Sequence, residues 1–182
     1  MGQGTRVTRA VIANAPHPVI FPRLLWTNPQ QREASQYMRA FRDTANDALV
    51  RKYGLAALLM KALNWQRTAT MEAVERDALL KDWSNPDTAI AMLNWYRASP
   101  MQVPGMDTPA EMTPFLAAPF PKLHMPVLVI WGVNDEALLP CQLEGLDEHI
   151  DRLTVVRVED AGHFIPWERP DAVNHAMRHW LA

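Results

Sequence analysis

The sequence places an acid and a histidine directly after two successive apolar segments. Asp135 follows residues 126–132, "PVLVIWG", and His163 follows residues 152–159, "RLTVVRVE". In an open parallel sheet, ligands bind outside the carboxyl ends of the strands, so both side chains fall where chemistry takes place. An acid that holds one ring nitrogen of a histidine leaves the other nitrogen free to accept a proton. The pair therefore predicts a general base, His163, that is oriented by Asp135.

Each of the two residues also fits a plain structural role. Asp135 has the residue type of a turn or of a helix N-cap, and a single loop histidine such as His163 usually has no function. The paired placement after consecutive strands favours the functional interpretation.

The hydrophobic pattern predicts the sheet that would bring these side chains together. Strands are predicted over residues 6–16, 126–132 and 152–159, the first from its β-branched residues and the second from its unbroken apolar run. A short helix over residues 141–150 and a final helix over residues 169–182 alternate with the last two strands. This β-α-β-α order predicts an α/β fold with about three parallel strands.

A helical block separates the first strand from the second. Apolar residues at helical spacing predict several helices between residues 31 and 97, with one ending at Gly54 and another capped by Asn85 ahead of Pro86. We therefore expect three parts. These are a strand leading into the block (residues 1–18), the inserted helical block (residues 19–122) and the C-terminal β-α-β-α part (residues 123–182).

The composition excludes several classes of protein. Lys and Arg number 18 against 20 Asp and Glu, and no basic block stands out, so nucleic acid is not an expected partner. The single cysteine, Cys141, excludes an internal disulfide and favours the cytoplasm. The N-terminal residues lack an apolar core, and the other apolar runs are short, so neither a signal peptide nor a membrane span is expected. The remaining histidines lack metal-ligand spacing, so no metal is expected. No organic cofactor is expected either, because an acid–histidine pair, a nucleophile and water need none.

Two segments carry a resemblance to a known family. Residues 126–140, "PVLVIWGVNDEALLP", and 160–181, "DAGHFIPWERPDAVNHAMRHWL", resemble the C-terminal part of an α/β-hydrolase. In that family, the catalytic triad runs nucleophile, acid, histidine along the chain. The resemblance implies that Asp135 and His163 are the acid and the histidine, that the helical block is the family's cap domain, and that "RAVIANAPHP" leads into this cap.

Within the helical block, residues 92–99, "MLNWYRAS", resemble a segment of epoxide hydrolases. The resemblance implies that Tyr96 donates a hydrogen bond to the epoxide oxygen as the ring opens, as a phenol can without being charged. A second cap tyrosine usually assists, but Ala40 stands at its expected position, one helical turn after Tyr37. We expect Tyr37, Trp95 and His17 to line a pocket for a small apolar substrate. Packing roles for all three remain alternatives.

The nucleophile of such an enzyme is missing from the sequence. No two of the seven glycines are four residues apart, so the nucleophile elbow G-x-S-x-G or G-x-D-x-G is absent, as is the H-G oxyanion segment. We therefore expect a truncated hydrolase whose open sheet edge pairs with a missing N-terminal half or with another copy. A dehalogenase or a serine esterase of the same fold, a non-catalytic binding fragment and a degenerate, unstable gene product are the alternatives.

Overall fold

The computed structural model describes residues 7–63, 71–109 and 120–182. Within these ranges the elements follow the predicted order of strand, helical block, strand, helix, strand and helix. The chain divides into two compact units, one formed by Met1–Ala34 with Met106–Ala182 and the other by Ser35–Gly105.

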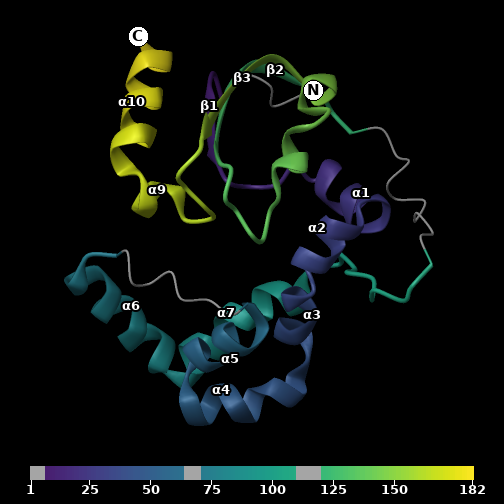
Figure 1. Ribbon diagram of the computed structural model, residues 1–182, viewed down its shortest axis with the longest axis vertical. Helices are drawn as coiled ribbons and strands as arrows, with labels where there is room; N and C mark the ends of the chain where they lie inside the picture. The colour runs from purple at the N-terminus through teal and green to yellow at the C-terminus, as the bar shows by residue number, and fades with distance from the viewer. Residues whose placement is uncertain (1–6, 64–70, 110–119) are drawn as a thin grey trace. The chain divides into compact units, whose positions relative to one another are not determined.

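The first unit is built on a parallel sheet of three strands, which Figure 1 labels. Their order in the sheet is β1-β2-β3. The strands are β1 (Ala10–Ala13), β2 (Leu123–Gly132) and β3 (Ile150–Val158). The prediction of an α/β fold with about three parallel strands is confirmed. β2 begins three residues before the predicted start, with an irregular register between Leu123 and Pro126, since proline has no N–H to give to the ladder.

Two C-terminal helices pack on the sheet. α9 (Ile165–Glu168) and α10 (Pro170–Leu181) place Ile165, Val173 and Ala176 against Leu128 and Ile130 of β2. These side chains are nearly inaccessible to water, so they bury the apolar faces of the two helices. α10 matches the final helix predicted over residues 169–182, whereas α9 was not predicted.

The single short helix predicted over residues 141–150 is wrong. The structure has a 3-10 turn (Pro140–Leu143) and a separate helix α8 (Leu146–His149). Gly145 lies between them with φ 78°, a left-handed conformation that ends one segment and starts the next.

Helices α1 (Ile20–Thr27) and α2 (Pro29–Ala34) belong to the unit of the sheet. The buried amide of Gln31 donates from Nε2 to the carbonyl of Ala137 at 2.8 Å and accepts from Leu139 N at 2.9 Å. Because these hydrogen bonds tie α2 to the loop after β2, the compact helical unit starts at Ser35, inside the predicted range of residues 19–122.

The regular elements among the described residues of the second unit are all helical. Its elements are α3 (Tyr37–Arg42), a 3-10 turn (Thr44–Asn46), α4 (Asp47–Tyr53), α5 (Leu55–Leu63), α6 (Ala73–Ser84) and α7 (Pro86–Ala98). Its hydrophobic core includes the buried side chains of Phe41, Val50, Leu58, Trp83 and Leu93.

Local signals place the helix ends of this unit as the sequence predicts. Gly54 ends α4 with φ 79°, and its N–H donates to the carbonyl of Val50. The Asn85 side chain accepts from the N–H groups of Asp87 and Thr88, and Pro86 occupies the first helical position of α7. Both predictions are confirmed.

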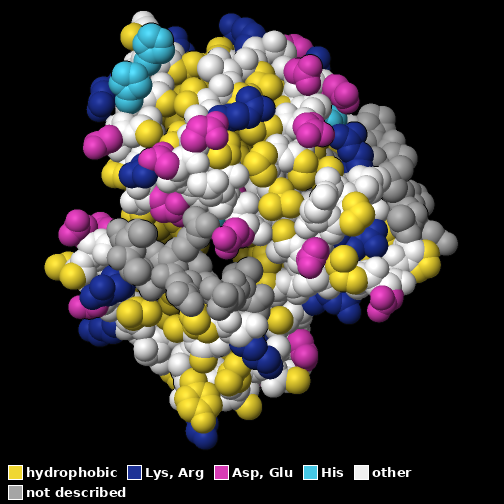
Figure 2. All heavy atoms as spheres, in the orientation of Figure 1, with side chains coloured by type: hydrophobic (Ala, Val, Ile, Leu, Met, Phe, Trp, Pro, Cys, Tyr) yellow, Lys and Arg dark blue, Asp and Glu magenta, His cyan; other side chains and the backbone are white. Residues whose placement is uncertain are grey.

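The surface carries mixed charge. Figure 2 shows Lys and Arg side chains interspersed with Asp and Glu over the visible face. No helix within residues 7–63, 71–109 and 120–182 is long and apolar enough to cross a membrane.

Candidate active site

Asp135 lies in a tight turn that follows β2. Its N–H donates to the carbonyl of Gly132, and its Oδ1 accepts from the N–H groups of Ala137 and Leu138, both at 2.8 Å. The predicted alternative of a turn residue is therefore correct as a description of the backbone. It accounts for only one of the two carboxylate oxygens, because Asp135 is 2% exposed and its Oδ2 faces two other side chains.

His163 meets the second oxygen of Asp135. Its Nδ1 lies 2.8 Å from Asp135 Oδ2, and its side chain is 34% exposed. Since a carboxylate can only accept hydrogen bonds, Nδ1 carries the proton in this pair, and Nε2 is the ring nitrogen left to accept one. The structure thus brings together the acid and the histidine that the sequence places after consecutive strands.

Asn14 is a third buried member of this cluster, which the sequence analysis missed. It follows β1, and its Nδ2 donates to Asp135 Oδ2 at 2.6 Å while its Oδ1 accepts from Gly132 N at 2.7 Å. Its φ of 39° is in the left-handed region, where asparagine is among the better tolerated residues. The available signal was an Asn at the carboxyl end of a predicted strand.

Glu168 holds the backbone on both sides of His163 and was also missed. Its Oε2 accepts from Gly162 N at 2.5 Å, and its Oε1 accepts from Phe164 N at 3.1 Å. A carboxylate five residues after the histidine, just before the predicted final helix, was the signal in the sequence. Both oxygens act as acceptors, so the side chain clamps the histidine loop on both sides of His163.

We expect Glu168→Gln to loosen this clamp, because one carboxylate oxygen becomes an NH2 group that faces a backbone N–H. The free energy of unfolding should fall by about 1–2 kcal/mol, which urea denaturation can measure. Amide hydrogen exchange at Gly162 and Phe164 should become faster. In the control Glu148→Gln, at an exposed residue of α8, the free energy of unfolding and the exchange rates should stay unchanged. Unchanged exchange at Gly162 in Glu168→Gln would contradict the clamp.

Gly132 lets the loop of Asp135 approach the loop of His163. A Cβ at this position would lie 2.5 Å from the carbonyl oxygen of Gly162 and 2.6 Å from that of Ala161. The N–H of Asn134 then donates to the Ala161 carbonyl at 2.9 Å. Because the obstructing atoms are backbone, only glycine allows the two loops to meet this closely.

His17 lies elsewhere in the same unit, against another histidine. Its ring stacks on His149 with centroids 4.4 Å apart and meets Phe120 edge-on, and its Nδ1 accepts from Val19 N. Burial, followed by the nearby His149 and Arg23, lowers the pKa of His17 to about 4. The ring is therefore neutral at pH 7, and its predicted place in a substrate pocket stays a prediction.

In the helical unit, Tyr96 and Tyr37 lie side by side. Their ring centroids are 6.3 Å apart, and the Phe41 ring lies 5.0 Å from Tyr96 and 5.2 Å from Tyr37. Burial raises the pKa of Tyr96, against the opposing effect of a side-chain hydrogen bond with Tyr37. The tyrosine partner of Tyr96 is therefore Tyr37, although Ala40 stands at the position that the resemblance favours.

Trp95 has a different environment from its neighbour Tyr96. It is 81% exposed, so it does not pack into the core of the helical unit as the structural alternative supposes. Its predicted role in substrate binding stays a prediction.

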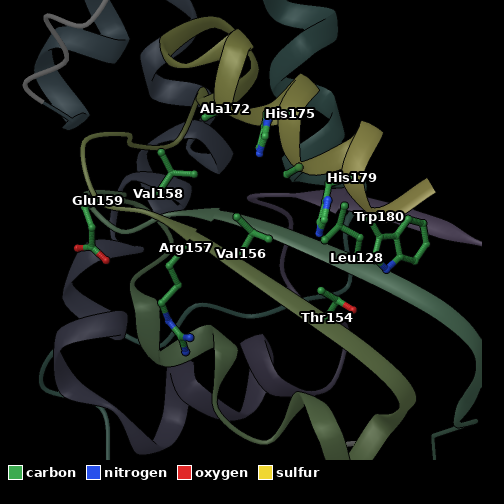
Figure 3. A pocket seen from close by; sticks show the side chains of 11 residues that line it. Leu128, Thr154, Val156, Arg157, Val158, Glu159, Ala172, His175, His179 and Trp180 are labelled. Carbon is green, nitrogen blue, oxygen red and sulfur yellow. The ribbon is translucent and has the colours of Figure 1, made fainter. Parts of the chain in front are cut away.

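A cavity of about 530 Å³ lies between β3 and α10. Figure 3 shows His175 and His179 extending from α10 toward the strand, while Arg157 points away from the helix. The lining residues do not include Asp135 or His163, so this cavity is separate from the acid–histidine pair. Among the described residues, no group of three or more His, Cys, Asp and Glu side chains could hold a metal ion.

Comparisons with known proteins agree with the fold. No protein-family model matches the chain. An epoxide hydrolase of the α/β-hydrolase superfamily, from metagenomes of hot environments, is 60% identical with a TM-score of 0.92; the match covers 100% of this chain and 61% of that one. The Bacillus megaterium epoxide hydrolase is 26% identical with a TM-score of 0.76, covering 96% of this chain and 61% of that one.

Two further observations come from these relatives. A mutant of the Bacillus megaterium enzyme was solved in complex with its product, (R)-3-[1]naphthyloxy-propane-1,2-diol. Among curated proteins, the AB hydrolase superfamily protein YfhM of Bacillus subtilis (strain 168) is 24% identical over 95% of this chain and 57% of its own length. The chain thus spans about three fifths of the length of the relatives it matches.

Proposed function

Since this chain is an α/β-hydrolase by fold and matches the C-terminal part of such enzymes, we propose that it supplies the acid–base machinery of an epoxide hydrolase. The observation that carries the proposal is the hydrogen bond between His163 Nδ1 and the buried carboxylate of Asp135. It leaves Nε2 of a partly exposed imidazole ready to accept a proton, as a general base requires.

The proposed reaction has two steps. In the first, a carboxylate nucleophile attacks an epoxide carbon, the carbon–oxygen bond of the ring breaks, and the released oxygen takes a proton. In the second, His163 Nε2 takes a proton from water while the water oxygen attacks the carbonyl carbon of the resulting ester. The ester bond to the substrate oxygen breaks, and the proton on His163 passes to that oxygen, which gives a diol. The second proton of the water, left on the nucleophile as a carboxylic acid, returns to the group that protonated the ring oxygen in the first step, and this restores the carboxylate.

The carboxylate nucleophile is not supplied by a motif of the 182 residues. We propose that the nucleophile comes from a separate segment that carries the nucleophile elbow. This chain then contributes the acid, Asp135, and the base, His163. The unpaired edge of β1 is suited to receive such a segment, because in the described part of the chain β1 pairs only with β2. A second copy of the chain is the alternative occupant. We also propose a cytoplasmic location, because the single cysteine excludes an internal disulfide and disulfides are typical of secreted proteins.

Tyr96, with Tyr37 as its hydrogen-bond partner, is the proposed donor to the epoxide oxygen. Burial raises the pKa of the Tyr96 phenol above its ordinary value, so the hydroxyl keeps its proton through the neutral range and can donate it to a developing alkoxide. We propose an aryl glycidyl ether as the substrate class, by analogy with the diol that the Bacillus megaterium mutant binds.

In a chimera whose other part, taken from the 60% identical epoxide hydrolase, supplies the nucleophile, we expect Tyr96→Phe to lower kcat for phenyl glycidyl ether by about 10²-fold, because one donor to the developing oxyanion is lost. Tyr53→Phe is the matched control, since Tyr53 is an exposed tyrosine of α4, 59% accessible, outside the Tyr37–Phe41–Tyr96 cluster. Steady-state diol formation measures both variants. Equal kcat values for the two would remove Tyr96 from the reaction.

The test of the proposed function is a chimera. The full chain replaces the matching part of the 60% identical metagenomic epoxide hydrolase, whose remaining part supplies the nucleophile. Diol formation from phenyl glycidyl ether that disappears in His163→Ala supports the proposal. A chimera that unfolds cooperatively but forms no diol contradicts it, and turnover of a haloalkane or a p-nitrophenyl ester in its place would reassign the reaction.

A further inference from the structure

The side chain of Asn14 joins three separate segments of the first unit. It starts at the end of β1, accepts from the N–H of Gly132 at the end of β2, and donates to Asp135 in the following loop. The two hydrogen bonds are 2.7 Å and 2.6 Å long, and the side chain is buried, with the residue 6% exposed. Asn14 therefore contacts the carboxylate oxygen that also holds His163.

The neighbours of Asn14 demand an amide. One neighbour is a backbone N–H, which needs an acceptor, and the other is a carboxylate oxygen, which needs a donor. An aspartate would turn a second acceptor toward Asp135, and a leucine would offer neither group. Asparagine also tolerates the left-handed φ of 39° at this position, so both the side chain and the backbone select it.

Donors surround the carboxylate of Asp135 on both oxygens. The N–H groups of Ala137 and Leu138 hold Oδ1, and Asn14 and His163 share Oδ2. Removing the Asn14 amide takes one of these two donors away from Oδ2 and frees the carboxylate to turn about its Oδ1 contacts. The direction of the hydrogen bond to His163 then depends on the histidine loop alone.

We propose that Asn14 is a positioning residue for His163 and acts through Asp135. The inference rests on the proposed function, because a positioning residue serves a base only if His163 is one. By fixing the orientation of the carboxylate, Asn14 fixes the imidazole tautomer and the direction of Nε2. Its second hydrogen bond, to Gly132, is a structural tie between β1 and β2.

The experiment separates these two roles by NMR of the 15N-labelled chain. The Nδ1–H proton of His163 should give a downfield, slowly exchanging signal, because it is held by a carboxylate. Asn14→Asp keeps an acceptor for Gly132 N–H but loses the donor to Asp135, whereas Asn14→Leu loses both. We expect the His163 signal to exchange at least tenfold faster in both variants, and to vanish in Asp135→Asn.

Matched controls lie in the next loop. Asn134 is exposed, and its Nδ2 donates to the Glu159 carbonyl. Asn134→Asp adds the same charge as Asn14→Asp, and Asn134→Leu removes the same kind of amide as Asn14→Leu. Both should leave the exchange rate of the His163 signal unchanged. A His163 signal in Asn14→Asp that exchanges as slowly as in the unsubstituted chain would overturn the proposal and leave Asn14 only its hydrogen bond between β1 and β2.

A second measurement needs no substitution at position 14. The side-chain amide protons of Asn14 should shift upfield in Asp135→Asn, since the carboxylate acceptor is lost; unchanged shifts would also overturn the proposal. Neither NMR result depends on turnover. A chimera without epoxide hydrolysis therefore contradicts the proposed reaction alone, while the His163 signal decides the role of Asn14.

Discussion

Asp135→Asn is expected to lower kcat of the chimera for phenyl glycidyl ether by about 10³–10⁴-fold. The amide that replaces the carboxylate would meet the N–H groups of Ala137 and Leu138 on one side and the Asn14 amide and His163 on the other. Four donors cannot all be satisfied by a group with a single acceptor oxygen. The NH2 group would turn toward a ring nitrogen, which selects the wrong tautomer of His163.

The control for this prediction is Asp147→Asn, an exposed acid in α8 that loses the same charge. Its kcat should stay within about twofold of the unsubstituted chimera, because surface substitutions away from such contacts have small effects. Circular dichroism and thermal melting show whether Asp135→Asn remains folded. A folded Asp135→Asn chimera with less than a tenfold loss of kcat would falsify the role of Asp135 as the orienting acid.

The second large effect is expected on stability. Gly132→Ala should lower the free energy of unfolding by about 3 kcal/mol, because the new methyl group would meet backbone oxygens of Gly162 and Ala161 rather than movable side chains. The strand end and the histidine loop would have to separate. Since the Gly132 N–H also donates to Asn14, the hydrogen bond that supports Asp135 should weaken as well.

Urea denaturation followed by tryptophan fluorescence measures this loss. Gly145→Ala is the comparison, because its φ of 78° strains an alanine while the nearest atoms to a new Cβ belong to side chains 3.5 Å away or more. We expect it to cost about 1 kcal/mol. If Gly132→Ala is no less stable than Gly145→Ala, the close approach of the two loops is not what requires glycine at position 132.

Local patterns in the sequence predicted most of the elements. The apolar run of residues 126–132 and the alternation of strands with helices predicted a parallel sheet, and the same strands placed Asp135 and His163 at one edge. Helix ends such as Gly54 and Asn85 were equally predictable, because a cap is a contact between residues that are neighbours in the chain.

The sequence by itself therefore determined the order of the elements, the parallel sheet and the acid–histidine pair, since each follows from short-range periodicity and chain connectivity. Only the tertiary structure decided the residues around that pair. Asn14 finds its partners 118 and 121 residues away, and the need for glycine at position 132 arises from a loop that follows another strand. Tyr37 likewise meets Tyr96 across two helices. Such contacts depend on how distant segments pack in three dimensions, and the spacing of residues in the sequence does not predict them.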